Sequence, residues 1–134
     1  LPMTGTVFFS VRDADKDLIA QPARELVEMG FALVATRGTA RVLQAAGLPV
    51  KTVNKVLEGR PHVVDALKNG EIHLVVNTTD GAQALTDSSS IRRAALTLRV
   101  PYYTTMAGAM AAAQAIKALK TGSLEVAPLQ SYSL

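Results

Sequence analysis

The hydrophobic residues of this chain fall into short continuous runs, separated by segments in which they recur every three or four positions. Continuous apolar runs are typical of strands with two buried faces, as in a parallel sheet. The run at 72–77 is apolar on both faces and is therefore expected inside the sheet. The predicted strands are 6–11, 31–35, 50–53, 72–77 and 102–104.

The segments between these runs have the spacing of amphipathic helices. The first has apolar positions from Leu18 to Val27 and ends at Gly30, and Asp13 and Asp15 offer N-caps for it. Because Pro22 cannot donate an intrahelical hydrogen bond, its regular part is expected to begin close to that residue. Further helices are predicted at about 39–46, at 62–69, from the serine patch 88–90 through residue 99, and at 106–120.

Strands and helices alternate with short connections, which favours a parallel sheet covered on both sides. The predicted fold class is α/β, with three layers in the order α/β/α. The length of 134 residues fits a single domain. We expect a linker remnant at 1–5, the domain at 6–122, and a tail at 123–134 that forms a terminal β segment or frays.

Composition removes several classes of function. The chain has no cysteine and two histidines, too few for a zinc site of the usual kind, and no bound metal is predicted. Its 14 basic residues are scattered and aromatic residues make up only 4% of the chain, which speaks against nucleic acid as a partner. No apolar run approaches the roughly 20 residues of a membrane helix. The expected compartment is the cytoplasm, by default.

Polar residues cluster where the predicted strands end. In an open parallel sheet these ends meet at one crevice. Hydroxyl, amide and ammonium groups all donate to anionic oxygens, so the arrangement favours a small molecule that carries phosphate. The residues concerned are Ser10, Thr36 and Thr39, Lys55, and Asn77 with Thr78 and Thr79.

Each of these residues also has an ordinary structural explanation. Thr36 and Thr39 fit helix caps, Lys16 and Lys55 fit solvated surface charges, and Asn77 fits a turn that satisfies backbone groups. Only their combination at successive strand ends favours a binding site.

Catalytic motifs are lacking, and no catalytic residue is predicted. The first strand is followed by neither the glycine pattern of a dinucleotide site nor that of a phosphate-binding loop. His62 and His73 have no convincing serine and aspartate partners and are interpreted as structural. The sequence therefore favours binding over bond breaking.

Several motifs resemble the C-terminal allosteric domain of the carbamoyl phosphate synthetase large subunit, and the resemblance covers nearly the whole chain. The most specific motif is the run from Val53 to His62. The motifs read SVR at 10–12, ATRGTA at 35–40, VNKVLEGRPH at 53–62, VNTT at 76–79 and IRRAA at 91–95.

The resemblance implies a five-stranded parallel sheet related to that of methylglyoxal synthase. It also implies a regulatory role in which UMP inhibits and IMP activates through one phosphate pocket, while ornithine acts at another interface. The parent enzyme would make carbamoyl phosphate for pyrimidine and arginine synthesis from bicarbonate and glutamine-derived ammonia, using ATP with Mg or Mn bound outside this chain. Its implied partners are the rest of the large subunit, a small glutaminase subunit and further copies in an oligomer.

Carried over by position, the resemblance implies a set of site residues. Lys16 and Lys55 would neutralise the phosphate, and the remaining pocket residues would donate hydroxyl or amide groups. The implied effector pocket is Ser10, Lys16, Thr36, Thr39, Lys55, Asn77 and Thr79, with Asp87 and Ile91 bordering the base and Thr104 at the ornithine interface.

Some positions depart from the family pattern. Ala82 stands where many bacterial members have a basic residue, and Ala107-Gly108-Ala109 replaces Asn-Gly-Gly, so effector preference and ornithine contact stay open. Lys55 separates the chain from the branch that responds to N-acetylglutamate, which has an aromatic residue there. An alternative is a methylglyoxal synthase-like lyase acting on dihydroxyacetone phosphate. Its general base would correspond to Arg60, which cannot accept a proton near neutral pH. A third alternative is an interaction module without a small ligand.

Overall fold

The computed structural model describes the backbone at residues 1–80 and 82–132, and side chains at 1–80 and 88–122. Five parallel strands form one sheet in the order β3-β2-β1-β4-β5. Its strands are β1 (Thr6–Ser10), β2 (Ala32–Ala35), β3 (Lys51–Thr52), β4 (Leu74–Asn77) and β5 (Tyr102–Tyr103). The predicted five-stranded α/β fold is confirmed.

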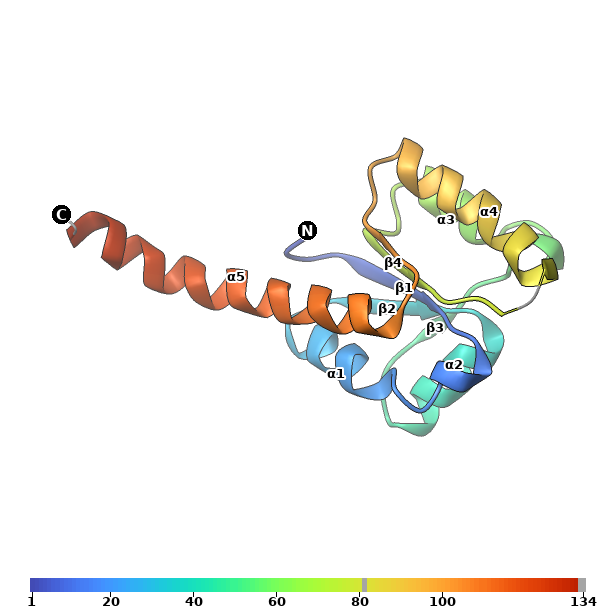
Figure 1. Ribbon diagram of the computed structural model, residues 1–134, viewed down its shortest axis with the longest axis horizontal. Helices are drawn as coiled ribbons and strands as arrows, with labels where there is room; N and C mark the ends of the chain where they lie inside the picture. The colour runs from blue at the N-terminus through green and yellow to red at the C-terminus, as the bar shows by residue number, and fades with distance from the viewer. Residues whose placement is uncertain (81, 133–134) are drawn as a thin grey trace.

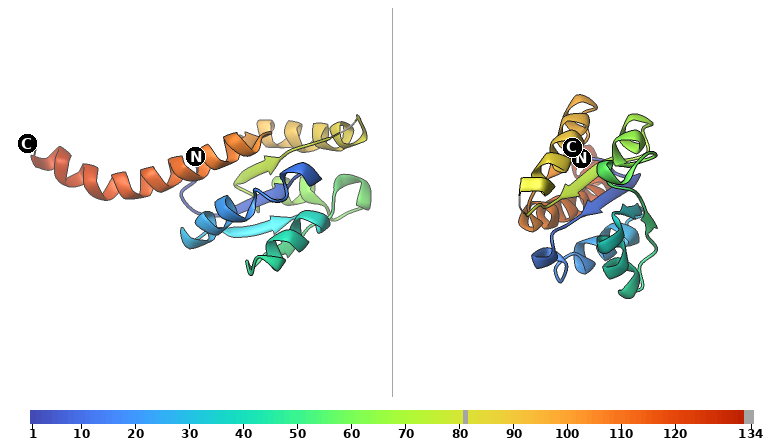
Figure 2. Two further views of the ribbon diagram at one scale, coloured as in Figure 1. Left: turned by 60° about the horizontal axis from the view of Figure 1, so that its bottom comes forward. Right: turned by 90° about the vertical axis from the view of Figure 1, so that its right-hand side faces the viewer.

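Helices cover both faces of this sheet (Figures 1 and 2). One face carries α1 (Ala20–Glu28), α2 (Arg37–Ala45) and the first turns of α5 (Met106–Tyr132). The opposite face carries α3 (Val63–Lys68) and α4 (Ala82–Thr97). Two single-turn 3₁₀ helices, η1 (Asp13–Asp15) and η2 (Val56–Glu58), lie in the loops after β1 and β3.

Alternating side chains of the inner strands fill two separate cores. Phe9 of β1 packs with residues of α1, α2 and α5, whereas Phe8 packs with residues of α3 and α4. Both phenylalanines are fully buried. All four residues of β4 are buried, as expected for an interior strand whose faces are both covered.

The start of α1 differs in part from the prediction. The helix begins at Ala20, close to Pro22, which is buried near its N-terminus. Asp13 and Asp15 do not cap it, because they form η1 instead. The predicted stop at Gly30 is confirmed: this glycine has φ 99°, a conformation that side chains with a Cβ rarely adopt.

One prediction for the last helices is wrong, and one alternative for the tail is not observed. Ser88–Ser90 does not cap a helix, because α4 already begins at Ala82 and these serines lie inside it. The segment 123–132 does not form the terminal β segment that the sequence left open, because α5 continues to Tyr132. In Figure 2 the later turns of α5 extend past the other elements. Within the described residues, no helix has both the length and the apolar character needed to span a bilayer.

Candidate functional site

The ends of β1 and β4 meet at the point where the order of the sheet reverses. From β1 the chain proceeds to β2 and β3 on one side, and it then returns to β4 and β5 on the other side. Ser10 and Asn77, the last residues of β1 and β4, are register partners. Ligands of open α/β sheets bind in the crevice outside the strand ends at such a switch point.

A hollow of about 360 Å³ lies at this point. It contains five residues of the implied effector pocket and one of the residues implied to border the base. Hydroxyl and amide groups, two lysines and an arginine face it together with two aspartates. The lining residues are Ser10, Val11, Arg12, Asp13, Lys16, Lys55, Asn77, Thr78, Thr79, Asp80, Ser88 and Ile91.

Lys16 reaches the hollow beside the N-terminus of α2. A Cβ placed on Gly38, in the first turn of that helix, would stand 3.3 Å from the Lys16 Nζ atom. The Lys16 side chain is 24% exposed, and its ammonium group forms an ion pair with Asp13. The absence of a side chain at Gly38 therefore lets the ammonium group lie close to the helix terminus.

Lys55 enters the hollow from the loop after β3. The Glu58 carboxylate accepts a hydrogen bond of 2.7 Å from the Lys55 backbone N–H. The Asn54 side-chain amide donates to the carbonyl oxygens of Gly59 and Pro61, at 3.3 and 3.1 Å. These bonds fix the backbone on both sides of Lys55, so the loop presents its exposed side chain toward the strand ends.

Thr36 and Thr39 do not line the hollow. Both are buried, with exposed fractions of 2% and 1%. The Thr36 hydroxyl donates to the Ser10 hydroxyl at 3.0 Å, and the Thr39 hydroxyl accepts a 3.1 Å hydrogen bond from the Val11 N–H. In this structure they support the wall of the hollow, whereas the resemblance implied that they contact the ligand.

Asn77 links three elements at the base of the hollow. Its Nδ2 donates to the Ser88 hydroxyl of α4 at 3.0 Å and to the Tyr102 hydroxyl of β5 at 2.9 Å. Burial raises the pKa of Tyr102 above its usual value, so the phenol remains protonated at neutral pH. These two bonds hold the amide in one orientation at the lining of the hollow.

A network that the sequence analysis missed closes the β1 side of the hollow. The Arg12 guanidinium pairs with Asp15 at 2.9 Å, and the Thr78 hydroxyl accepts a 3.0 Å bond from the Arg12 N–H. Burial works to raise the pKa of Asp15, but hydrogen bonds from Thr78 and Arg12 outweigh it, and the pKa is lowered. The signal in the sequence was a polar or charged residue within two positions of each strand end, Arg12 after β1 and Thr78 after β4.

Thr104 lies at a smaller neighbouring hollow of about 200 Å³. The two hollows share Asn77, Thr79 and Ser88, and the smaller one also contains Arg92 and Tyr102. The structure therefore brings Thr104 close to the first hollow but does not place it in the lining. The Asp87 side chain lies outside the described residues.

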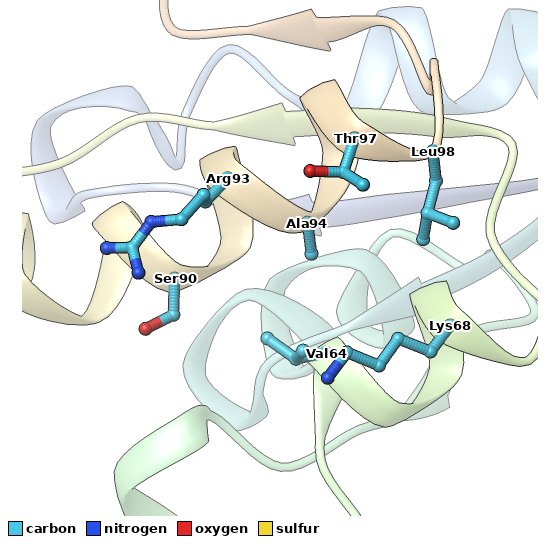
Figure 3. Close-up of a pocket in the computed structure, with 7 residues that line it drawn as sticks. All are labelled: Val64, Lys68, Ser90, Arg93, Ala94, Thr97 and Leu98. Carbon is cyan, nitrogen blue, oxygen red and sulfur yellow. The ribbon is translucent and has the colours of Figure 1, made fainter.

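A further hollow of about 370 Å³ lies between α3 and α4 (Figure 3). Figure 3 shows Lys68 and Arg93 at its rim, with Val64, Ala94 and Leu98 along it. It contains none of the predicted site residues, and its polar side chains, Lys68, Ser90, Arg93 and Thr97, include no amide. The hollow at the strand ends is the better candidate, because ammonium, hydroxyl and amide donors converge there.

The family model of the MGS-like domain matches residues 18–104. The chain belongs to this family. It is 60% identical over 132 residues to the carbamoyl phosphate synthase large chain of Brucella suis biovar 1 (strain 1330), and 61% identical over 132 residues to that of Rhizobium meliloti (strain 1021). Each match covers 98% of this chain but 11% of the relative. The resemblance found in the sequence is thus confirmed.

A solved structure shows the same fold at lower sequence identity. The crystal structure of methylglyoxal synthase from Elizabethkingia anophelis NUHP1 superposes with a TM-score of 0.66 at 20% identity. The match covers 84% of this chain and 79% of the synthase. At this identity the similarity shows the fold alone.

Proposed function

We propose that this chain is the regulatory domain of a carbamoyl phosphate synthase large chain. Its hollow at the strand ends would bind the phosphate group of UMP or IMP. The observation that carries the proposal is the convergence of Lys16 and Lys55 on one hollow with Ser10, Asn77 and Thr79. The two ammonium groups would neutralise a phosphate dianion, while the hydroxyl and amide groups would orient the phosphate and ribose.

The action of such an effector on distant active sites is a coupling between binding equilibria. It requires different effector affinities in two arrangements of the whole enzyme, typically worth about 1–3 kcal/mol. ATP-dependent synthesis of carbamoyl phosphate, with ATP and Mg or Mn, would belong to other parts of the protein. Ornithine would act near Thr104, and the small glutaminase subunit would supply ammonia. These assignments, like a cytoplasmic location, follow from the relatives and stay predictions.

Calorimetric titration of UMP and of IMP into the 134-residue chain tests the site. Binding of at least one nucleotide is expected, with a large loss of affinity in Lys55→Ala and in Lys16→Met. Lys51→Ala is the matched control, because Lys51 is an exposed lysine on β3 that does not line the hollow. Full affinity in Lys55→Ala would refute the assigned site, and no binding at millimolar nucleotide would favour an interaction module.

No structural observation favours the lyase alternative. The Arg60 guanidinium pairs with Asp65 at 2.7 Å, and Arg60 does not line the hollow. An arginine also cannot act as the general base of the reaction. The chain is therefore expected not to convert dihydroxyacetone phosphate. Release of inorganic phosphate from that compound at an enzymatic rate would overturn the proposal that this domain only binds.

A further inference from the structure

The candidate effector site already contains an acidic side chain. Asp13 lines the hollow together with Lys16 and Lys55, and its carboxylate forms an ion pair with the Lys16 ammonium group. The side chain of Asp13 is 95% exposed. An anion that belongs to the chain itself thus lies against one of the two cations that a phosphate would need.

The electrostatics agree with this geometry. The pKa of Asp13 is lowered first by the hydrogen bond and charge of Lys16, and further by the charge of Lys55. Both ammonium groups therefore stabilise the same carboxylate. A phosphate group attracted by the same two lysines would have to occupy the space around Asp13.

The two aspartates of η1 differ in how they are held. Asp15 is 8% exposed and is bound by Arg12 and Thr78, so it is fixed as part of the wall. The Asp13 carboxylate is solvated and bound to one flexible lysine. Ion pairs this exposed contribute little to stability, so an incoming dianion can displace the carboxylate at low cost.

We propose that Asp13 is a resident competitor for the effector phosphate: its carboxylate occupies the anion position at Lys16 and must leave it when a phosphate-bearing ligand binds. Asp13 thereby sets the affinity of the site and lowers it below what the two lysines would give. The inference rests on the proposed effector site and names a residue that restricts it.

Displacement of the Asp13 carboxylate from Lys16 would also remove a contact that holds the first residue of η1. That single turn carries both Asp13 and Asp15, and the Arg12 N–H that precedes it is bound by Thr78 after β4. Ligand binding at Lys16 would therefore change the contacts of the loop between β1 and α1. This loop is the segment in which we expect the largest ligand-dependent change in amide chemical shift.

The test is a titration of the 134-residue chain with inorganic phosphate and, separately, UMP at fixed ionic strength, followed by NMR chemical shifts. Asp13→Asn is expected to tighten the affinity for both by about two- to fivefold, the range that an exposed ion pair supports. Asp13→Glu keeps the charge and should remain near wild type. Asp17→Asn is the matched control, because it removes the same charge from an exposed position that does not line the hollow.

The outcomes separate this inference from the proposed function. If binding depends on Lys16 and Lys55 but Asp13→Asn does not tighten it, the competitor role is wrong and the effector site stands. If Asp17→Asn tightens binding as much as Asp13→Asn, the effect is one of net charge and the competitor role is again wrong. If neither wild type nor Asp13→Asn binds phosphate, UMP or IMP, both proposals fail.

Discussion

The hydroxyl of Thr36 donates a hydrogen bond to the hydroxyl of Ser10, with 3.0 Å between the two oxygens. This bond joins the first residue after β2 to the last residue of β1. Because a serine hydroxyl has one hydrogen and two lone pairs, Ser10 can accept from Thr36 and still donate its own hydrogen into the hollow. A buried threonine thus orients a donor that a ligand would contact.

Replacing Thr36 by valine removes this orienting bond. We expect Thr36→Val to weaken UMP or IMP binding by about 0.5–1.5 kcal/mol, the usual net value of one hydrogen bond. Thr36→Ser retains the hydroxyl and should bind nearly as wild type. Calorimetry on the two variants measures the difference. Equal affinity of both for the nucleotide would show that Ser10 needs no partner.

Thr39 is expected to stabilise the folded chain through its hydrogen bond with the backbone of Val11. Its hydroxyl is the acceptor for the buried Val11 N–H. Thr39→Val leaves that N–H without this acceptor, which should lower the free energy of unfolding by about 1–3 kcal/mol. Thr39→Ser keeps the acceptor and is the control. Urea denaturation followed by circular dichroism measures both, and a valine variant as stable as the serine variant would contradict the assignment.

Gly38→Ala separates stability from binding. Alanine is the better helix former by roughly 0.5–1 kcal/mol, so the variant should be at least as stable as wild type. Its Cβ would nevertheless stand 3.3 Å from the Lys16 Nζ atom, so the ammonium group would have to shift by a few tenths of an ångström. Nucleotide affinity should therefore fall severalfold while the melting temperature holds or rises.

The control for this variant is Gln44→Ala. Gln44 is exposed and lies near the C-terminal end of α2, whereas Lys16 lies beside its N-terminal end. It should raise helix stability without changing affinity. Unchanged nucleotide binding in Gly38→Ala would mean that Lys16 does not need its position beside the helix terminus.

Asp65 should contribute stability that depends on pH. Its carboxylate accepts from the Arg60 guanidinium at 2.7 Å and from the His62 N–H at 2.9 Å, and these bonds hold its pKa below the usual value. Above pH of about 4 the residue is ionised in both states and the stabilisation is present in full. As the pH falls further, the unfolded chain takes up the proton first, and the stabilisation is lost down to the folded pKa.

Asp65→Asn should therefore be less stable than wild type at pH 7, and the difference should shrink as the pH falls below about 4. Urea midpoints at pH 7, 4 and 3 measure this. Asp17→Asn, at an exposed position, should follow the wild-type profile. A stability difference at Asp65 that is constant across this range would rule out the ionised cap as its source.

Much of the fold was predictable because hydrophobic periodicity reports local burial. The strands around Phe8 and Val75 are continuous apolar runs, and the structure buries both residues completely. Helix boundaries were less predictable, because weak local signals compete. The serines at 88–90 resemble a cap, but α4 begins at Ala82 and includes them, and the helix packs on the sheet through Ile91 and Ala95.

The sequence by itself determined which residue types stand at the strand ends, and hence that Ser10, Lys55 and Asn77 would share one edge of a parallel sheet. Only the tertiary structure decided which of the polar residues at the strand ends face the crevice. Thr36 and Thr39 turn inward to satisfy Ser10 and the Val11 N–H. Asp13 and Lys16 pair locally within one turn, but the fold brings that turn to the same hollow as Lys55 and Asn77. Strand order and burial bring groups together across the chain, and local sequence carries no record of such contacts.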